Sequence, residues 1–214
     1  MPDDQPLPAT IGPIAVPQDD VSAATWAWAR RTLPAYLFTH SVRAYCWGAT
    51  IATTRGLGFD RQVLWTASLF HDVGLTRLST NTMCFEVEGG EIARRFLERQ
   101  GLAADLADRV AVAIVLHMRA GVTLDDGAEA LLLDQATSID VRGEGYATID
   151  GVRDAVVHDF PRGRFDRHFL AAIEREASRR PTCQSARLLH ETDLAGWMAR
   201  SPWRGSKADG AALR

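Results

Sequence analysis

The chain has 214 residues and a mass of 23.5 kDa, which is enough for one ordinary domain with its own core. Its 46% hydrophobic and 24% charged residues match an average soluble protein, which excludes a disordered chain, a collagen-like repeat and a membrane bundle. The 24 Lys and Arg against 27 Asp and Glu give a formal net charge of -3. The molecule as a whole therefore lacks a basic field for nucleic acid, and we expect no nucleic-acid partner.

The three cysteines, Cys46, Cys84 and Cys183, are widely spaced and form no CxxC pair. An odd number at such spacings suits a reducing compartment, so we predict buried free thiols, no disulfide scaffold and a cytoplasmic location. No apolar run approaches the roughly 18 to 20 residues that a membrane helix requires. We therefore expect no membrane partner.

Both ends of the chain differ in composition from the middle. Residues 1–20 are rich in proline and acids and contain no basic residue, which predicts a flexible or surface-draped N-terminal arm and not a secretion signal. Residues 201–214 carry Gly, Ser and charges, which predicts a loose C-terminal tail. The domain itself is expected over residues 21–200.

Between these ends, apolar residues recur every three or four positions, without a convincing run of strict alternation. This pattern predicts an all-α fold, a single domain of about eight or nine helices. Glycines or a proline mark most of the expected helix ends. The expected helices cover residues 22–31, 35–55, 60–70, 88–100, 104–119, 126–141, 149–159, 166–179 and 185–199.

Histidine and carboxylate side chains fall on the inward faces of four of these helices. His40 lies on an aromatic stripe of the second helix, and His71 ends the third helix in the core with Asp72 beside it. His117 and Asp140 lie on apolar stripes of the fifth and sixth helices. One such histidine alone is more often an ordinary core residue, but the ordered set indicates a metal site. Nitrogen and carboxylate donors without thiolate suit a divalent ion such as Zn, Fe or Mn with an open coordination position.

The order of His40, the His71-Asp72 pair and a distant helical Asp resembles the HD superfamily of metal-dependent hydrolases over residues 35–160. Within it, the chain is most similar to cyanamide hydratase-like proteins, through four stretches: L-F-T-H-S-V-R-A-Y at 37–45, H-D-V-G-L-T at 71–76, T-M-C-F-E-V-E-G-G at 82–90 and A-I-V-L-H-M at 113–118. This resemblance implies an HD-type helical fold, a zinc ion and addition of water to a nitrile-like carbon. The leading interpretation is a hydratase that converts cyanamide to urea.

The sixth helix offers three candidates for the last metal ligand. Asp140 is preferred because D-V-R-G at 140–143 resembles the corresponding stretch of the hydratase-like group. Asp134 is the reserve, and Thr137 occupies the position where some HD proteins place the metal aspartate. The predicted ligand set is therefore His40, His71, Asp72 and Asp140, with zinc as the favoured ion and Fe or Mn as alternatives.

Under the hydratase hypothesis, the bound cation lowers the pKa of its water from about 15.7 towards about 7. The resulting hydroxide then attacks an electrophilic carbon. A short, partly apolar pocket would hold the nitrile. Four side chains are expected to line or border this pocket: Trp47, Met83, Phe85 and His117.

Within the T-M-C-F-E likeness, Thr82 is the candidate for handling the proton or the nitrogen, and a hydroxyl that bonds backbone is its alternative. Glu86 is expected to act as general base or to hold Thr82, unless it is a solvated carboxylate at a helix start. Asp72 is placed with these catalytic groups. Arg43 is expected to hold Asp72 or another carboxylate behind the ligands.

Two other functions stay open. An HD-type phosphohydrolase acting on a nucleotide or phosphodiester would use Arg43, Arg77 and Arg119 as cations, but Leu75 stands where many HD phosphodiesterases carry Lys. A non-catalytic helical module that senses a ligand is the third reading. The R-G-R at 162–164 is interpreted as a solvated turn. A small-molecule substrate is the expected partner, and a homodimer is left open.

Overall fold

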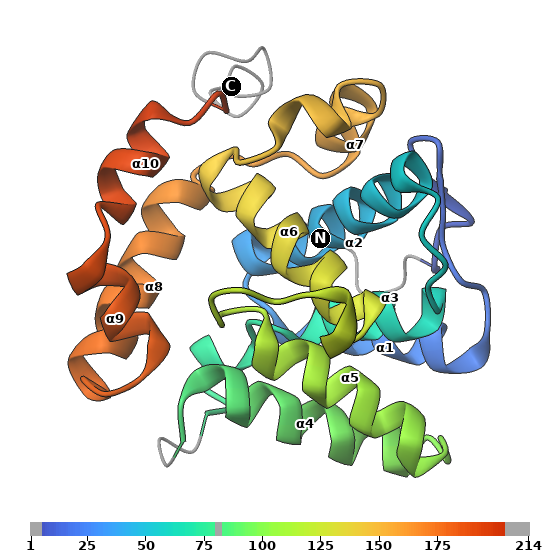
Figure 1. Ribbon diagram of the computed structural model, residues 1–214. Coiled ribbons are helices and arrows are strands. Elements are labelled where there is room, and N and C mark those ends of the chain that lie inside the picture. Colours follow the sequence, from blue (N-terminus) through green and yellow to red (C-terminus); the bar gives the residue numbers. More distant parts are fainter. Residues whose placement is uncertain (1–5, 80–82, 204–214) are drawn as a thin grey trace.

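The computed structural model describes residues 6–79 and 83–203, and within them the chain folds as a single helical domain (Figure 1). The all-α prediction is therefore confirmed. The described residues contain ten α-helices: α1 Asp20–Thr32, α2 Ala35–Arg55, α3 Arg61–Phe70, α4 Phe85–Arg99, α5 Ala104–Leu116, α6 Ala128–Arg142, α7 Arg153–Asp159, α8 Phe165–Arg179, α9 Gln184–Glu191 and α10 Leu194–Arg200.

Local sequence signals set several of the helix ends. The Asp19 carboxylate accepts a hydrogen bond from the Ser22 amide at 2.8 Å and starts α1, and Asp60 caps α3 in the same way. The helices α2 and α6 end at Gly56 and Gly143, whose φ angles of +66° and +74° lie in the left-handed region that favours glycine. Capping chemistry therefore explains why these boundaries were predictable.

The helix expected over 185–199 is divided into α9 and α10. The break falls at Thr192 and Asp193, where the Asp193 carboxylate accepts a hydrogen bond from the Gly196 amide and starts a new helix. Short 3-10 turns at Val73–Leu75, Leu124–Asp126 and Tyr146–Ile149 join other helices. This division explains why ten helices are seen where eight or nine were expected.

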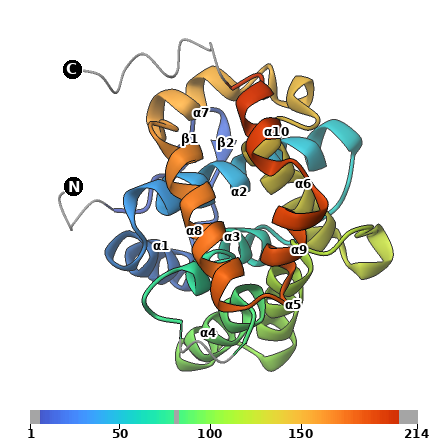
Figure 2. The ribbon, with the colours of Figure 1, turned by 90° about the vertical axis from the view of Figure 1, so that its left-hand side faces the viewer.

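Helix α2 forms the centre of the fold, and most of its residues are buried. It packs against α3, α6 and α8, while α4 and α5 pair with each other and α5 also packs on α3 (Figure 1). Helix α9 packs on α8, and α10 contacts α6 (Figure 2). Side chains that project from α2 therefore reach the interior of the domain.

Parts of both end segments pack on the helices. An antiparallel pair of two-residue strands, β1 Thr10–Ile11 and β2 Ile14–Ala15, places Ile11 in the core, and the Tyr45 hydroxyl donates to the Ala15 carbonyl at 2.7 Å. At the other end, Trp203 is buried and donates its indole N–H to the Ile139 carbonyl at 2.7 Å. Packing thus extends beyond residues 21–200 at both ends, and residues 1–5 and 204–214 lie outside the described part.

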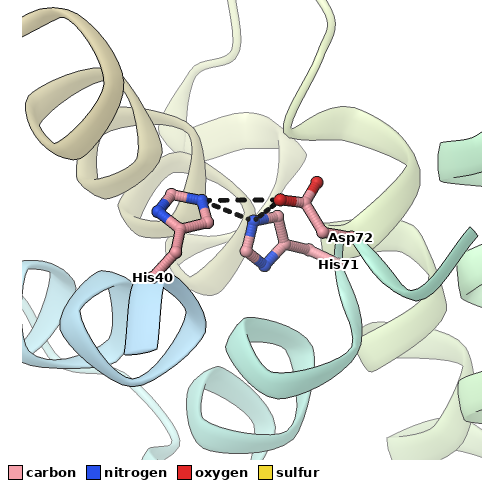
Figure 3. A group of neighbouring side chains, drawn as sticks. All are labelled: His40, His71 and Asp72. Carbon is pink, nitrogen blue, oxygen red and sulfur yellow. Dashed lines mark hydrogen bonds and ion pairs between the residues drawn. The ribbon is translucent and has the colours of Figure 1, made fainter. Parts of the chain in front are cut away.

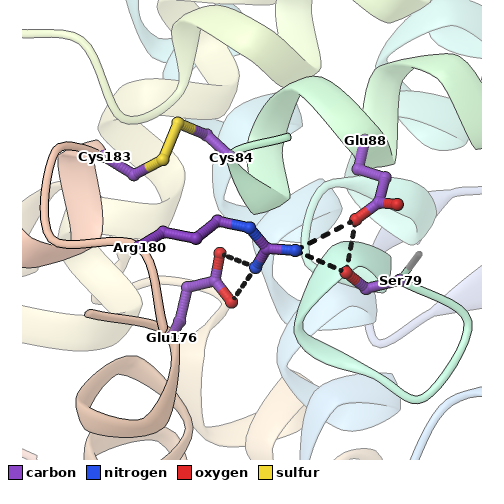
Figure 4. The surroundings of a disulfide bond; sticks show 6 residues. All are labelled: Ser79, Cys84, Glu88, Glu176, Arg180 and Cys183. Atoms are coloured by element: carbon purple, nitrogen blue, oxygen red, sulfur yellow. Dashed lines mark hydrogen bonds and ion pairs between the residues drawn. A yellow bond between two sulfur atoms is a disulfide. The ribbon is translucent and has the colours of Figure 1, made fainter. Parts of the chain in front are cut away.

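The prediction of free thiols is wrong for two of the three cysteines. Cys84 and Cys183 form a disulfide that joins the start of α4 to the start of α9, and only Cys46 is a free, buried thiol (Figure 4). The two partners are 99 residues apart, so no local spacing signalled the pair. The cysteines therefore give no ground for a cytoplasmic location. None of the described helices is long and apolar enough to cross a membrane.

Buried charges lie beside this disulfide. Arg180 forms ion pairs with Glu176 at 2.5 Å and with Glu88 at 3.6 Å, and it donates to the Ser79 hydroxyl at 3.1 Å (Figure 4). These contacts join the end of α8 to α4 and to the loop before it. Covalent and ionic links therefore hold α8 and α9 against α4 at one place.

Candidate metal centre

The three histidines predicted for the site come from three different helices and lie close together in the interior of the domain. His40 projects from the middle of α2, whereas His71 and His117 each follow the last residue of a helix, α3 and α5. Asp72 comes directly after His71, and the backbone then turns sharply through Gly74, where a Cβ atom would overlap the Phe85 carbonyl. The glycine of H-D-V-G thus allows the chain after the His-Asp pair to pack on the start of α4.

His40, His71 and Asp72 turn their ligand atoms towards one another (Figure 3). Nε2 of His40 lies 3.1 Å from Nε2 of His71 and 3.6 Å from Oδ2 of Asp72, and His71 Nε2 lies 3.3 Å from that same oxygen. All three side chains are almost completely buried. These three are the described residues that form a group of metal-ligand type.

Hydrogen bonds on the far side of each ring fix the tautomers of both histidines. His40 Nδ1 lies 2.7 Å from an Asp140 carboxylate oxygen, and His71 Nδ1 lies 2.7 Å from the Ser68 carbonyl oxygen. Both oxygens accept, so each Nδ1 donates and each Nε2 presents a lone pair. Two lone-pair nitrogens and a carboxylate oxygen then face one another, an arrangement that is costly unless a cation lies between them.

The donor set fits a divalent cation. Bonds of about 2.0–2.2 Å to a tetrahedral centre place neighbouring ligand atoms about 3.3–3.6 Å apart, and the three distances found are 3.1, 3.3 and 3.6 Å. Asp72 Oδ2 is buried and accepts no hydrogen bond from the described residues. Three protein ligands also leave coordination positions for water or substrate.

The ionisable side chains of the site also favour binding of a cation between His40, His71 and Asp72. Burial favours a neutral carboxyl, but the positive charge that His71 can carry outweighs it and lowers the pKa of Asp72 to about 2. Burial likewise acts to lower the pKa of His71, yet the Asp72 charge overcomes it and the net shift is upward. The Asp72 carboxylate is therefore ionised at neutral pH and favours positive charge next to it, either a proton on His71 or a bound cation in its place.

Asp140, predicted as a metal ligand, lies behind His40 and outside the group of ligand type. Its Oδ2 accepts from His40 Nδ1 and from Arg43 Nη2, both at 2.7 Å, and its Oδ1 accepts from Arg43 Nε and from Trp47 Nε1, both at 2.9 Å. These donors occupy both carboxylate oxygens, on the side of the His40 ring away from His71. Arg43 accordingly holds Asp140 and not Asp72.

The other two candidates on α6 face a cavity that the His-Asp group also lines. This cavity has a volume of about 780 Å³, and Asp134 and Thr137 both contribute to its wall. Burial raises the pKa of Asp134 to about 6. The Thr137 hydroxyl donates to the Asp134 backbone carbonyl at 3.0 Å. Neither residue belongs to the group of ligand type formed by His40, His71 and Asp72.

His117 borders the cavity next to Asp72. Its Nδ1 donates to the Ile114 carbonyl, which leaves Nε2 with a lone pair at 3.9 Å from Asp72 Oδ1. Burial and the neighbouring His71 lower the pKa of His117 to about 4. The ring is therefore neutral at pH 7.

The apolar side chains predicted to form a small nitrile pocket do not line the cavity. Trp47 is buried against Trp203 with its N–H on Asp140, Phe85 is a core residue whose ring contacts His117, and Met83 is partly exposed. Glu86 is buried outside the cavity, where burial raises its pKa. Thr82 lies outside the described residues.

Sequence reasoning missed three side chains around His40. The Phe165 ring stacks on the His40 ring at a centroid distance of 4.6 Å, and the Phe169 ring lies at 5.8 Å. Arg162, interpreted as part of a solvated turn, is buried and donates to the Asp140 carbonyl at 2.6 Å. The apolar spacing of the two phenylalanines on α8 could have signalled an inward face, but no sequence pattern marked Arg162 as buried.

Comparisons with known proteins agree with this geometry. No curated protein matches the chain. Residues 37–142 match the HD domain, and this segment includes His40, the His71-Asp72 pair, His117 and Asp140. Residues 37–142 are therefore similar to the HD domain, and the converging side chains of His40, His71 and Asp72 all lie within the matched segment.

Proposed function

We propose that the protein is a metal-dependent enzyme of hydrolase type that uses water as the nucleophile. One observation carries this proposal: the lone-pair atoms of His40, His71 and Asp72 converge in the wall of a cavity large enough for a small organic substrate. A site in which protein side chains filled every coordination position of the metal would favour a structural metal instead. The HD domain match supports the same class of activity.

A divalent cation bound there would supply Lewis acidity and lower the pKa of water. His40, His71 and Asp72 are the residues that would hold it, and Asp140 keeps His40 in the tautomer that this requires. His117 is neutral and has its Nε2 lone pair beside Asp72, so it is placed to accept a proton from water in the cavity. We propose zinc as the ion, since the donors are nitrogen and oxygen, with Fe or Mn as alternatives.

For the substrate, the first candidate is a small nitrile-like molecule, with cyanamide as the test case. The H-D-V-G-L-T and T-M-C-F-E stretches resemble hydratase-like HD proteins, and Leu75 puts an apolar side chain where phosphodiesterases of this superfamily often carry a cation. The positions of Trp47, Met83 and Phe85 give this candidate no support from the cavity wall.

A phosphohydrolase is the second candidate, and the cavity itself favours it. A volume of about 780 Å³ exceeds what a nitrile of three heavy atoms needs, and Arg55, Arg119 and Arg142 all line the wall. Arg119 is paired with Asp126, and Arg142 with Glu144, so an anionic substrate would have to compete for these guanidinium groups. Arg43 and Arg77, the other arginines considered for this role, do not line the cavity.

The experiment is a substrate panel assayed with the metal-loaded protein. Urea release from cyanamide supports the hydratase, and phosphate or nucleoside release from nucleotides supports the second candidate. His71→Ala and the free metal ion are the two controls for each assay. If the wild-type protein, loaded with zinc, iron or manganese, hydrates or hydrolyses none of the panel, the enzyme proposal loses to a ligand-sensing role.

A further inference from the structure

The segment 160–169 lies outside the HD match and packs against His40 and Arg43. The Phe160 and Pro161 carbonyls each accept a hydrogen bond from Arg43 Nη1 at 3.2 Å. Phe165 stacks on the His40 ring, with its plane inclined by 24°. One short stretch of chain therefore contacts both His40 and the arginine that holds Asp140.

Arg162 is the member of this segment that contacts Asp140. Its Nη1 donates to the Asp140 carbonyl at 2.6 Å and lies 3.3 Å from Oδ2 of the same residue. The guanidinium is held between two rings, at 4.5 Å from the Trp203 centroid and 5.0 Å from the Phe165 centroid. With only 3% of its surface exposed, Arg162 has little freedom to leave this position.

The charges around Asp140 explain why a second guanidinium is useful. Arg43 donates to both carboxylate oxygens of Asp140, at 2.9 and 2.7 Å, and Arg162 adds its contacts to the carbonyl oxygen and to Oδ2. Asp166 accepts from Arg162 Nη2 at 2.6 Å, so each buried guanidinium has a carboxylate to balance it. These contacts fix the orientation of the Asp140 carboxylate, whose Oδ2 accepts from His40 Nδ1 at 2.7 Å.

We propose that Arg162 is a positioning residue of the metal centre. It holds the backbone and carboxylate of Asp140 so that His40 keeps its proton on Nδ1 and presents Nε2 to the cation. The segment 160–169 then helps to position the side chains of the site, although it lies beyond the matched residues 37–142. This inference rests on the proposed function in one respect, namely that His40 is a metal ligand.

Three variants separate this role from simple packing. Arg162→Gln removes the charge and the fork of donors, Arg162→Lys keeps the charge, and Asp166→Asn removes the other partner of Arg162 without touching Asp140. Zinc affinity is measured by chelator competition, and cobalt substituted at the site reports its geometry by visible absorption. The His40 ring N–H resonance is followed by NMR in the metal-free protein.

We expect Arg162→Gln to weaken zinc binding about 10- to 100-fold and to shift both the cobalt spectrum and the His40 N–H resonance. Arg162→Lys should recover part of the affinity, and Asp166→Asn should stay within about threefold of wild type. Circular dichroism verifies that each variant is folded, and Arg162→Lys carries the test if Arg162→Gln does not fold.

Wild-type zinc affinity and an unchanged His40 resonance in folded Arg162→Gln would overturn the inference. A wild-type protein that binds zinc, cobalt, iron and manganese no better than a His71→Ala variant would instead overturn the proposed function. The His40 resonance in the metal-free protein then decides the role of Arg162 on its own.

Discussion

His40 donates its Nδ1–H to Asp140 at 2.7 Å, on the side of the ring opposite the nitrogen that faces His71. The carboxylate expected to bind the metal thus accepts a hydrogen bond from the histidine and lies outside the group of ligand type. A carboxylate behind a ligating imidazole fixes the ring orientation and increases its basicity. The sixth helix therefore contributes to the site from behind.

Replacing a ligand should remove the cation. We expect His71→Ala to purify with far less than one equivalent of divalent metal, because it removes one of the three converging donors. Elemental analysis after exhaustive dialysis measures the occupancy. His158→Ala, at an exposed histidine, is the matched control and should keep its metal. Full occupancy in His71→Ala would rule that residue out as a ligand.

Asp140→Asn should be strongly destabilising. The amide keeps the shape of the side chain but leaves two buried guanidinium groups without their shared negative charge. Breaking a buried ion pair in this way costs about 3–5 kcal/mol of unfolding free energy. Urea denaturation measures the change, with Asp154→Asn at an exposed ion pair as the control, expected to change stability by less than about 1 kcal/mol. Equal midpoints for the two variants would show that the network does not stabilise the fold.

The disulfide should stabilise the domain and tether α9. Replacing Cys84 and Cys183 with serine should lower the unfolding free energy by about 2–5 kcal/mol, since the crosslink closes a long loop. It should also increase hydrogen exchange in α9, which supplies Gln184, Arg187 and Leu188 to the cavity wall. Peptide mapping under non-reducing conditions checks the pairing itself. In protein never exposed to a reductant, alkylation of Cys84 before unfolding would contradict it, and buried Cys46 serves as the internal reference.

Asp134 should make stability depend on pH between about 4 and 6. Burial raises its pKa in the folded state to about 6, so the folded state binds the proton more tightly than the unfolded chain. The free energy of unfolding therefore falls as pH rises through this window. Above pH 6 the Asp134 carboxylate is ionised in its buried position, and its full destabilising effect is present. We expect Asp134→Asn to gain stability relative to wild type at pH 7 and to gain little at pH 4. Thermal unfolding at both pH values measures this, with Asp125→Asn at an exposed position as the control. A difference independent of pH would contradict the assignment.

Much of the architecture could be predicted because it depends on local chemistry. The spacing of apolar residues and the caps at Asp60 and Gly143 define helices whatever lies around them. The break at Thr192 was missed because one polar residue in an amphipathic stretch is common within helices. The Cys84–Cys183 pair was missed because its partners meet only after α8 and α9 fold back on α4.

The sequence by itself determined which side chains face inward, since helical periodicity assigns His40, His71, His117 and Asp140 to buried stripes. Only the tertiary structure decided which side of each ring faces which partner. That choice depends on the relative rotation and depth of α2 and α6. It also depends on a turn that brings in Arg162, which lies 22 residues after Asp140 in the sequence. Periodicity fixes a direction from one helix axis, whereas coordination and hydrogen bonding need several axes placed to within a fraction of an ångström.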